Sequence, residues 1–227
     1  MMKIALLALA LAAPASAQQF TPRTEYEAAT ERPKPLPAIP ATLRGIVRAP
    51  SPERLLVRTL GGGEIPIDIS WYEVERFEPR ADGRFLGIVL SGYEAEGYVV
   101  VDRAGGGTLL ATGVAPAFSP DGRWFAAAGI SEAGWGNLEG VAVWEVLARS
   151  SVRRFFSDTV PHGTGWRVDG WPRRDCVALS HAPADIEVPE GTEWDEAVRR
   201  APRTHYAIRV DRPRMALSAG ASRPPCA

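Results

Sequence analysis

Hydrophobic and polar residues alternate with a period of two along much of the chain from residue 43 onward. The alternation runs through residues 55–60, stops at a triple glycine at residues 61–63, and resumes through residues 65–70. Two alternating segments on either side of a glycine turn predict a β-hairpin. Pro66 interrupts the second segment and predicts an edge strand, because proline has no backbone N–H to donate.

A longer pattern recurs three times after this hairpin. F-S-P-D-G-R-W at residues 118–124 matches F-E-P-R-A-D-G-R-F at residues 77–85, and W-R-V-D-G-W at residues 166–171 is a weaker third copy. Each copy is followed by an apolar run, a loop, a second strand-like segment and a short closing strand. Four short strands in about 40 to 48 residues is the period of a propeller blade.

The second copy carries a resemblance to a known family. F-S-P-D-G-R-W-F-A-A-A-G at residues 118–129, followed by G-V-A-V-W-E-V at residues 140–146, resembles the WD40-like β-propeller repeat of the PD40 type, as in TolB-like periplasmic propeller domains. The resemblance implies an all-β fold, a small or incomplete β-propeller-like array of three to four antiparallel blades. A closed propeller needs at least four blades, and the sequence has only three copies of the repeat. Either residues 43–74 supply the fourth blade, or the array of sheets stays open. The repeat specifies a structural unit and no activity.

This pattern divides the chain into a β domain and its flanking segments. The β domain spans residues 43–220, in units of about 43–75, 77–113, 114–158 and 159–220, and a tail follows at residues 221–227. The last unit contains an insertion, residues 182–203, in which Thr192 is expected to cap a single short helix over residues 193–200.

The N-terminal segment predicts export. Lys3, an apolar run over residues 4–13 and an A-x-A site ending at Ala17 are typical of a signal peptide over residues 1–17, and the mature protein is then secreted or periplasmic. The apolar run is too short to span a membrane. Residues 18–42 are rich in proline and predict an extended arm.

Net charge and cysteine content limit the partners and the cysteine pairing that we expect. The 26 basic and 27 acidic residues give a net charge of −1, which predicts no attraction to nucleic acid or to a membrane surface. Cys176 and Cys226 are the two cysteines, and an oxidising compartment permits a disulfide between them. The alternative is a buried Cys176 and a free Cys226.

Catalytic motifs are absent from the sequence. There is no G-x-S-x-G or H-E-x-x-H motif, and the three histidines have no metal-ligand spacing. We therefore expect no enzyme activity, no cofactor, and no catalytic or metal-binding residues. The Asp-Gly pairs that share one repeat position are interpreted as structural turns: Asp82 and Gly83, Asp121 and Gly122, and Asp169 and Gly170.

The longer loops are expected at the rim opposite these turns. Loops on a rigid scaffold often bind partners, and those expected on this rim contain the candidate binding residues Glu94, Glu96, Trp135, Asn137, His162 and Trp194. These features favour an exported, non-enzymatic module of the cell envelope that binds a protein partner or acts as a scaffold. One alternative is a module that binds a glycan or cell-wall fragment through Trp135, Trp166, Trp171 and Trp194, with Trp71, Trp124 and Trp144 in the core. The other is a propeller relic of a hydrolase.

Overall fold

A computed structural model describes residues 34–80, 82–92, 95–130, 138–220 and 226 of the chain. The chain divides into two units, Met1–Lys34 and Pro35–Ala227, and all the described helices and strands lie in the second unit. The predicted signal peptide and the first part of the predicted proline-rich arm lie outside the described residues.

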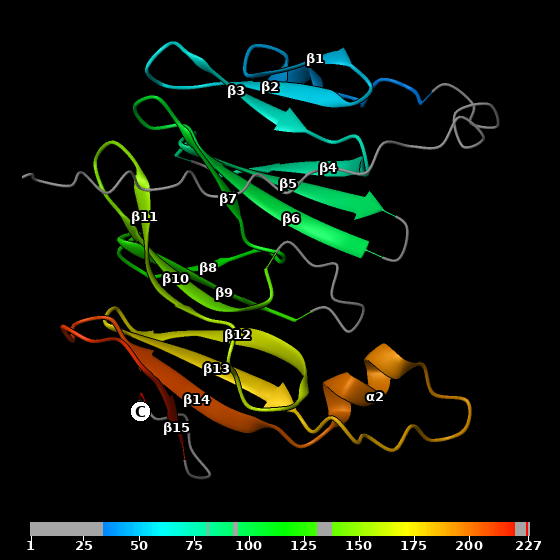
Figure 1. The fold of residues 1–227 in the computed structure, drawn as a ribbon, viewed down its shortest axis with the longest axis vertical. Coiled ribbons are helices and arrows are strands. Elements are labelled where there is room, and N and C mark those ends of the chain that lie inside the picture. The colour runs from blue at the N-terminus through cyan, green and yellow to red at the C-terminus, as the bar shows by residue number, and fades with distance from the viewer. Residues whose placement is uncertain (1–33, 81, 93–94, 131–137, 221–225, 227) are drawn as a thin grey trace, which may run out of the picture. The chain divides into compact units, whose positions relative to one another are not determined.

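The second unit consists mostly of four antiparallel β-sheets, which follow one another along the chain (Figure 1). The predicted all-β class is confirmed. The first sheet contains β1 (Val47–Ser51), β2 (Arg54–Arg58) and β3 (Glu64–Asp68), and the second contains β4 (Glu73–Pro79), β5 (Phe85–Gly92), β6 (Ala95–Asp102) and β7 (Thr108–Ala111). The third contains β8 (Ala117–Phe118), β9 (Trp124–Gly129), β10 (Gly140–Val146) and β11 (Ser151–Ser157), and the fourth contains β12 (Thr164–Arg173), β13 (Cys176–Ala182), β14 (Thr204–Arg209) and β15 (Leu217–Ala219). Within each sheet the spatial order follows the chain, and β3, which holds Pro66, is an edge strand as predicted.

Two short helical segments accompany the strands in the described part of the chain. A 3₁₀ turn, η1 (Ala41–Leu43), precedes β1, which begins at Val47. Helix α2 (Trp194–Arg200) lies in the insertion between β13 and β14, close to its predicted range. The predicted Thr192 cap is wrong. The N-cap is Glu193, whose side chain makes no capping hydrogen bond. Thr192 lies one residue earlier, and its backbone N–H donates to the Pro189 carbonyl in a turn that precedes the helix.

Neighbouring sheets share hydrophobic cores, and alternation along the strands explains how. In β5, Leu86, Ile88 and Leu90 pack into a cluster with the first sheet, whereas Phe85 packs into a cluster with the third. In β9, likewise, Phe125 and Ala127 join the cluster with the second sheet, whereas Ala126 and Ala128 join the cluster with the fourth. Inner strands are therefore apolar on both faces, which is why they appear in the sequence as continuous apolar runs.

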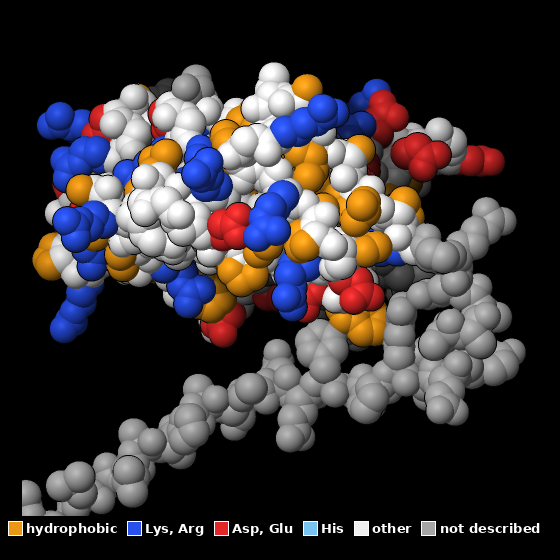
Figure 2. All heavy atoms as spheres, turned by 90° about the horizontal axis from the view of Figure 1, so that it is seen from above, with side chains coloured by type: hydrophobic (Ala, Val, Ile, Leu, Met, Phe, Trp, Pro, Cys, Tyr) orange, Lys and Arg blue, Asp and Glu red, His pale blue; other side chains and the backbone are white. Residues whose placement is uncertain are grey.

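The outer faces of the first and fourth sheets carry different stabilising contacts. On the first sheet, Arg48 donates two hydrogen bonds to Glu64, at 2.9 and 2.8 Å. In Figure 2, which views this end from above, basic, acidic and hydrophobic side chains are intermixed. On the fourth sheet, a disulfide joins Cys176 of β13 to Cys226, and both cysteines pack with Ala207 in a small buried cluster. The predicted disulfide is confirmed.

Antiparallel order creates two edges at which the chain turns. We call the edge at which the even-numbered strands end the turn edge, and the edge at which the odd-numbered strands end the loop edge. The described loops of the loop edge are residues 52–53, 69–72, 112–116, 130, 138–139, 158–163 and 183–203. No helix in the described part of the chain has the length and apolar character needed to cross a membrane.

Candidate functional site

The Asp-Gly pair of the second repeat forms a tight turn at the turn edge. The carboxylate of Asp121 accepts hydrogen bonds from the Ser119 hydroxyl at 2.7 Å and from the Arg123 backbone N–H at 3.1 Å. The hydrogen bond from Ser119 is the largest cause of a pKa of Asp121 below its ordinary value. Gly122 has a φ of 67°, a conformation that favours glycine.

The first repeat builds the same turn. Asp82 accepts a hydrogen bond from the Arg84 backbone N–H at 2.9 Å, and Gly83 has a φ of 65°. In both turns the aspartate bonds to the backbone two residues further along, so these carboxylates have a structural task.

The interpretation of Asp169 and Gly170 as a turn is wrong. Both residues lie inside β12, and the chain turns only at residues 174–175. The register of β12 against β13 shifts beside Gly170, whose φ is 137°. The Asp-Gly letters of the third copy thus mark an irregularity within a long strand.

A polar network at the turn edge joins the first three sheets. Asp102 is fully buried and accepts hydrogen bonds from the Arg84 guanidinium at 2.7 and 2.8 Å and from the Ser151 hydroxyl at 2.7 Å. Burial opposes the charge of Asp102, but these hydrogen bonds and that from the Ala104 amide hold its pKa below the ordinary value. Arg103 donates to the Arg58 carbonyl at 2.7 Å and so connects this network to the first sheet.

A cleft of about 590 Å³ lies at the same edge, between the third and fourth sheets. Three turns or strand ends surround it: the turn between β8 and β9, the turn between β12 and β13, and the end of β14. It is lined by Asp121, Arg123, Trp124, Arg173, Arg174, Asp175, Val210 and Asp211. No sequence pattern indicated this cleft, because its three parts are separated by about fifty and about thirty-five residues, and only the fold brings them together.

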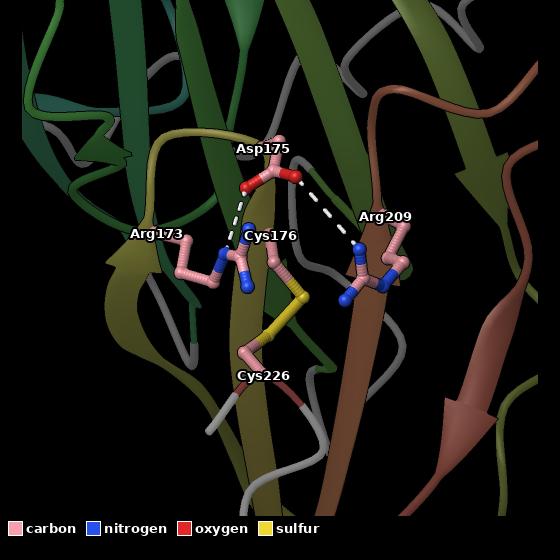
Figure 3. Close-up of a disulfide and its surroundings, with 5 residues drawn as sticks. All are labelled: Arg173, Asp175, Cys176, Arg209 and Cys226. Carbon is pink, nitrogen blue, oxygen red and sulfur yellow. Dashed lines mark ion pairs between the residues drawn. A yellow bond between two sulfur atoms is a disulfide. The ribbon is translucent and has the colours of Figure 1, made fainter.

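The acidic side chains of the cleft are largely engaged within the protein. Asp175 lies between Arg173, at 3.4 Å, and Arg209, at 3.8 Å, directly beside the disulfide (Figure 3). Asp121 is held by its own turn. By contrast, no described side chain forms a hydrogen bond or an ion pair with the guanidinium of Arg123 or Arg174.

The structure separates the candidate binding residues predicted from the sequence. Glu94, Trp135 and Asn137 lie outside the described residues. Glu96 is exposed at the start of β6, His162 is exposed between β11 and β12, and Trp194 is the first residue of α2. All three belong to the loop edge by topology, and no contact among them is present in the described structure.

The loop edge does hold several exposed hydrophobic residues, of which the sequence singled out only Trp194. Of the ten large hydrophobic side chains exposed in the described part of the chain, five lie here: Trp71, Val114, Ile130, Val188 and Trp194. Trp71 is 52% exposed, so its predicted place in the core is wrong. It follows β3 in the loop to β4, and the alternation of the strand no longer decides its orientation there.

Two tryptophans expected at a binding surface are instead engaged in the structure. Trp166 is 6% exposed and packs against the rings of His181 and Tyr206. Trp171 donates from its indole nitrogen to the Ala117 carbonyl at 2.9 Å, across to the third sheet. Trp166 is therefore buried, and Trp171 is half-buried with its indole nitrogen engaged within the protein.

Ser180, Asp169, Arg203 and His205 form a polar group on and beside the fourth sheet. The Ser180 hydroxyl donates to Asp169 at 2.9 Å and accepts from Arg203 at 2.7 Å, and His205 lies 3.5 Å from the same aspartate. Ser180 is fully buried and forms no hydrogen bond with a described histidine, so the arrangement is not that of a serine nucleophile with a histidine base. Among the described residues no group of histidine, cysteine, aspartate and glutamate side chains has the arrangement of a metal site.

Comparison with known proteins gives no relative: the chain matches no protein-family model and no curated protein. Its function is therefore inferred from its own side chains and their geometry.

Proposed function

We propose that this chain is an exported, non-enzymatic β-propeller-like protein of the cell envelope that binds a protein partner through its loop edge. The observation that carries the proposal is that Trp71, Val114, Ile130, Val188 and Trp194 are all exposed and all belong to this edge by topology. Exposed aromatic and aliphatic side chains on a polar background are typical of protein-binding surfaces.

The repeated sheets support the propeller-like arrangement. Three successive units each contribute a four-stranded antiparallel sheet, and each sheet shares a hydrophobic core with the next. No core cluster among the described residues joins the first sheet to the fourth, which favours an open array over a closed ring. The charged outer face of the first sheet fits an end that faces water.

Two features support export. The first is the signal-like segment at residues 1–17. The second is the disulfide between Cys176 and Cys226, because such bonds persist in oxidising compartments such as the periplasm. The protein is accordingly proposed to be secreted or periplasmic.

The test is a capture experiment from envelope extract with matched variants. Trp71→Ala with Trp194→Ala removes two aromatic side chains from the loop edge, and we expect the captured partner to fall by about tenfold, because aromatic residues dominate such interfaces. Leu109→Ala with Phe156→Ala is the control, since these two side chains are 41% and 42% exposed on the closing strands β7 and β11.

Comparing the partner captured by the two double variants tests whether binding takes place at the loop edge. Full capture by the tryptophan variant, or an equal loss in the control, contradicts binding at the loop edge. Quenching of intrinsic fluorescence by a glycan with no protein partner captured favours the glycan-binding alternative, and turnover of peptide or ester substrates favours the hydrolase alternative.

A further inference from the structure

The cleft at the turn edge has a composition suited to a ligand of its own. It lies on the edge opposite the surface of the proposed function, between the third and fourth sheets. Its volume of about 590 Å³ falls in the range of about 300–1,000 Å³ that is usual for ligand sites. We propose that this cleft binds an acidic peptide segment, with its carboxylates on Arg123 and Arg174 and an apolar side chain on Trp124.

The charged side chains of the cleft that have no partner within the protein indicate which charge a ligand should carry. Asp175 is already shared by Arg173 and Arg209, and Asp121 is occupied by Ser119 and its turn. Asp211 is the third carboxylate in the lining, and it too forms no hydrogen bond or ion pair with a described side chain. The guanidiniums of Arg123 and Arg174 also form no hydrogen bond or ion pair with a described side chain, although Arg123 lies near enough to Asp121 to lower its pKa. Two guanidiniums against one carboxylate leave a positive balance to meet a ligand, and a guanidinium binds a carboxylate through two parallel hydrogen bonds.

The apolar part of the lining gives the second requirement. Val210 is buried, and Trp124 is half-buried against the core between the third and fourth sheets. Trp124 thus contributes apolar surface to the same cleft as the two arginines. A ligand that fills the cleft therefore carries an apolar group close to its negative charges.

A peptide meets these requirements better than a small anion. Arg123 and Arg174 are exposed, and a single exposed ion pair contributes little to affinity. Several carboxylates and an apolar side chain on one chain add their contributions without a separate association step for each. The net charge of −1 excludes general attraction of acids to the protein, so binding has to come from this local arrangement.

Fluorescence anisotropy with a defined probe tests the proposal. The probe is a short fluorescein-labelled peptide of glutamate, leucine and glycine, and its partner probe carries glutamine in place of glutamate. We expect the full-length protein to bind the first peptide and not the second, and Arg123→Gln with Arg174→Gln to weaken binding by at least about tenfold. Added salt is expected to weaken binding as well.

A matched variant controls for charge alone. Arg44→Gln with Arg54→Gln removes the same charge from exposed residues that lie outside the cleft, and we expect it to bind as the wild type does. Equal loss in both double variants, or equal binding of the two peptides, overturns the proposal. Displacement of the probe by free glutamate or phosphate as effective as that by unlabelled peptide also overturns it, in favour of a small-anion site.

The same assay separates this site from the proposed function. The Trp71→Ala, Trp194→Ala variant keeps the cleft intact, so it is expected to bind the acidic peptide fully even though it loses the captured partner. Loss of peptide binding in that variant contradicts an independent site at the turn edge.

Discussion

The hydroxyl of Ser151 donates a hydrogen bond of 2.7 Å to the carboxylate of Asp102, although the two residues lie 49 positions apart and in different sheets. Asp102 ends β6 and Ser151 begins β11, so this bond fixes the second sheet to the third at the turn edge. Arg84 binds the same carboxylate and also donates to the Leu147 carbonyl of the third sheet at 2.7 Å. The position of one sheet on the next is thus set by directional polar contacts as well as by the apolar core.

Removal of the charge at Asp102 is expected to destabilise the protein. Asp102→Asn leaves the guanidinium of Arg84 without its charged partner in a largely buried place, where the side chain of Arg84 is 19% exposed. We expect the free energy of unfolding to fall by about 3 kcal/mol, and by about 1.5 kcal/mol for Ser151→Ala, which removes one hydrogen bond. Urea unfolding followed by circular dichroism measures both changes.

The exposed ion pair on the first sheet is the control for this experiment. Arg48→Gln breaks a pair with equally good geometry to Glu64, but both side chains are exposed. It is expected to change the unfolding free energy little, because solvent screens such pairs. A loss as large as that of Asp102→Asn contradicts the role given to burial.

The stability of the protein is expected to depend on pH in the acid range through Asp102. Its pKa in the folded protein lies below the ordinary value of about 3.9. The contribution of Asp102 is therefore complete above about pH 4 and is lost as the pH falls through its folded pKa. Urea unfolding at a series of pH values should show a shallower decline below pH 4 for Asp102→Asn than for the wild type, and identical slopes would remove Asp102 from the explanation.

The disulfide is expected to contribute substantially to stability. It joins residues 50 positions apart, and the chain-entropy model assigns about 4 kcal/mol to a loop of this length. Cys176→Ala with Cys226→Ala should lower the unfolding free energy by about this amount in non-reducing urea. Added reductant should destabilise the wild type and leave the double variant unchanged, whereas an equal effect on both proteins would contradict the prediction.

Two glycines with nearly the same φ provide a matched test of close packing. Gly140 has a φ of 141° and Gly170 a φ of 137°. A Cβ on Gly140 would lie 2.1 Å from the Ser157 carbonyl oxygen, whereas one on Gly170 would meet nothing within 4 Å. Gly140→Ala is therefore expected to cost about 2 kcal/mol more than Gly170→Ala in thermal or urea unfolding. Equal costs would show that the conformation alone decides the effect.

Local sequence signals were sufficient for most of the strands. Alternation around the triple glycine predicted the hairpin of β2 and β3, and Asp121 with Gly122 predicted the turn before β9, because each signal acts over a few residues. The same Asp-Gly pair at Asp169 and Gly170 led to an incorrect prediction of a turn. There the aspartate binds the Ser180 hydroxyl and the Arg167 guanidinium, contacts to a neighbouring strand and along its own, and not the backbone of a turn.

The candidate sites were much less accessible to sequence reasoning. The cleft is assembled from turns that are distant in the chain, so no spacing rule links Arg123 to Arg174. Trp71, which was predicted to lie in the core, is exposed, and Trp166, which was predicted to lie at a binding surface, is buried. Exposure in a loop, or burial against His181, depends on packing that periodicity does not encode.

The described hydrophobic clusters each join a sheet only to its neighbour in the chain. Cooperativity in such an arrangement passes from one sheet to the next, as it does in repeat proteins. Loosening of the fourth sheet would reach the first only by way of the two between them. Amide exchange should then fall into graded zones along the chain, with the inner strands β5, β9 and β10 slowest.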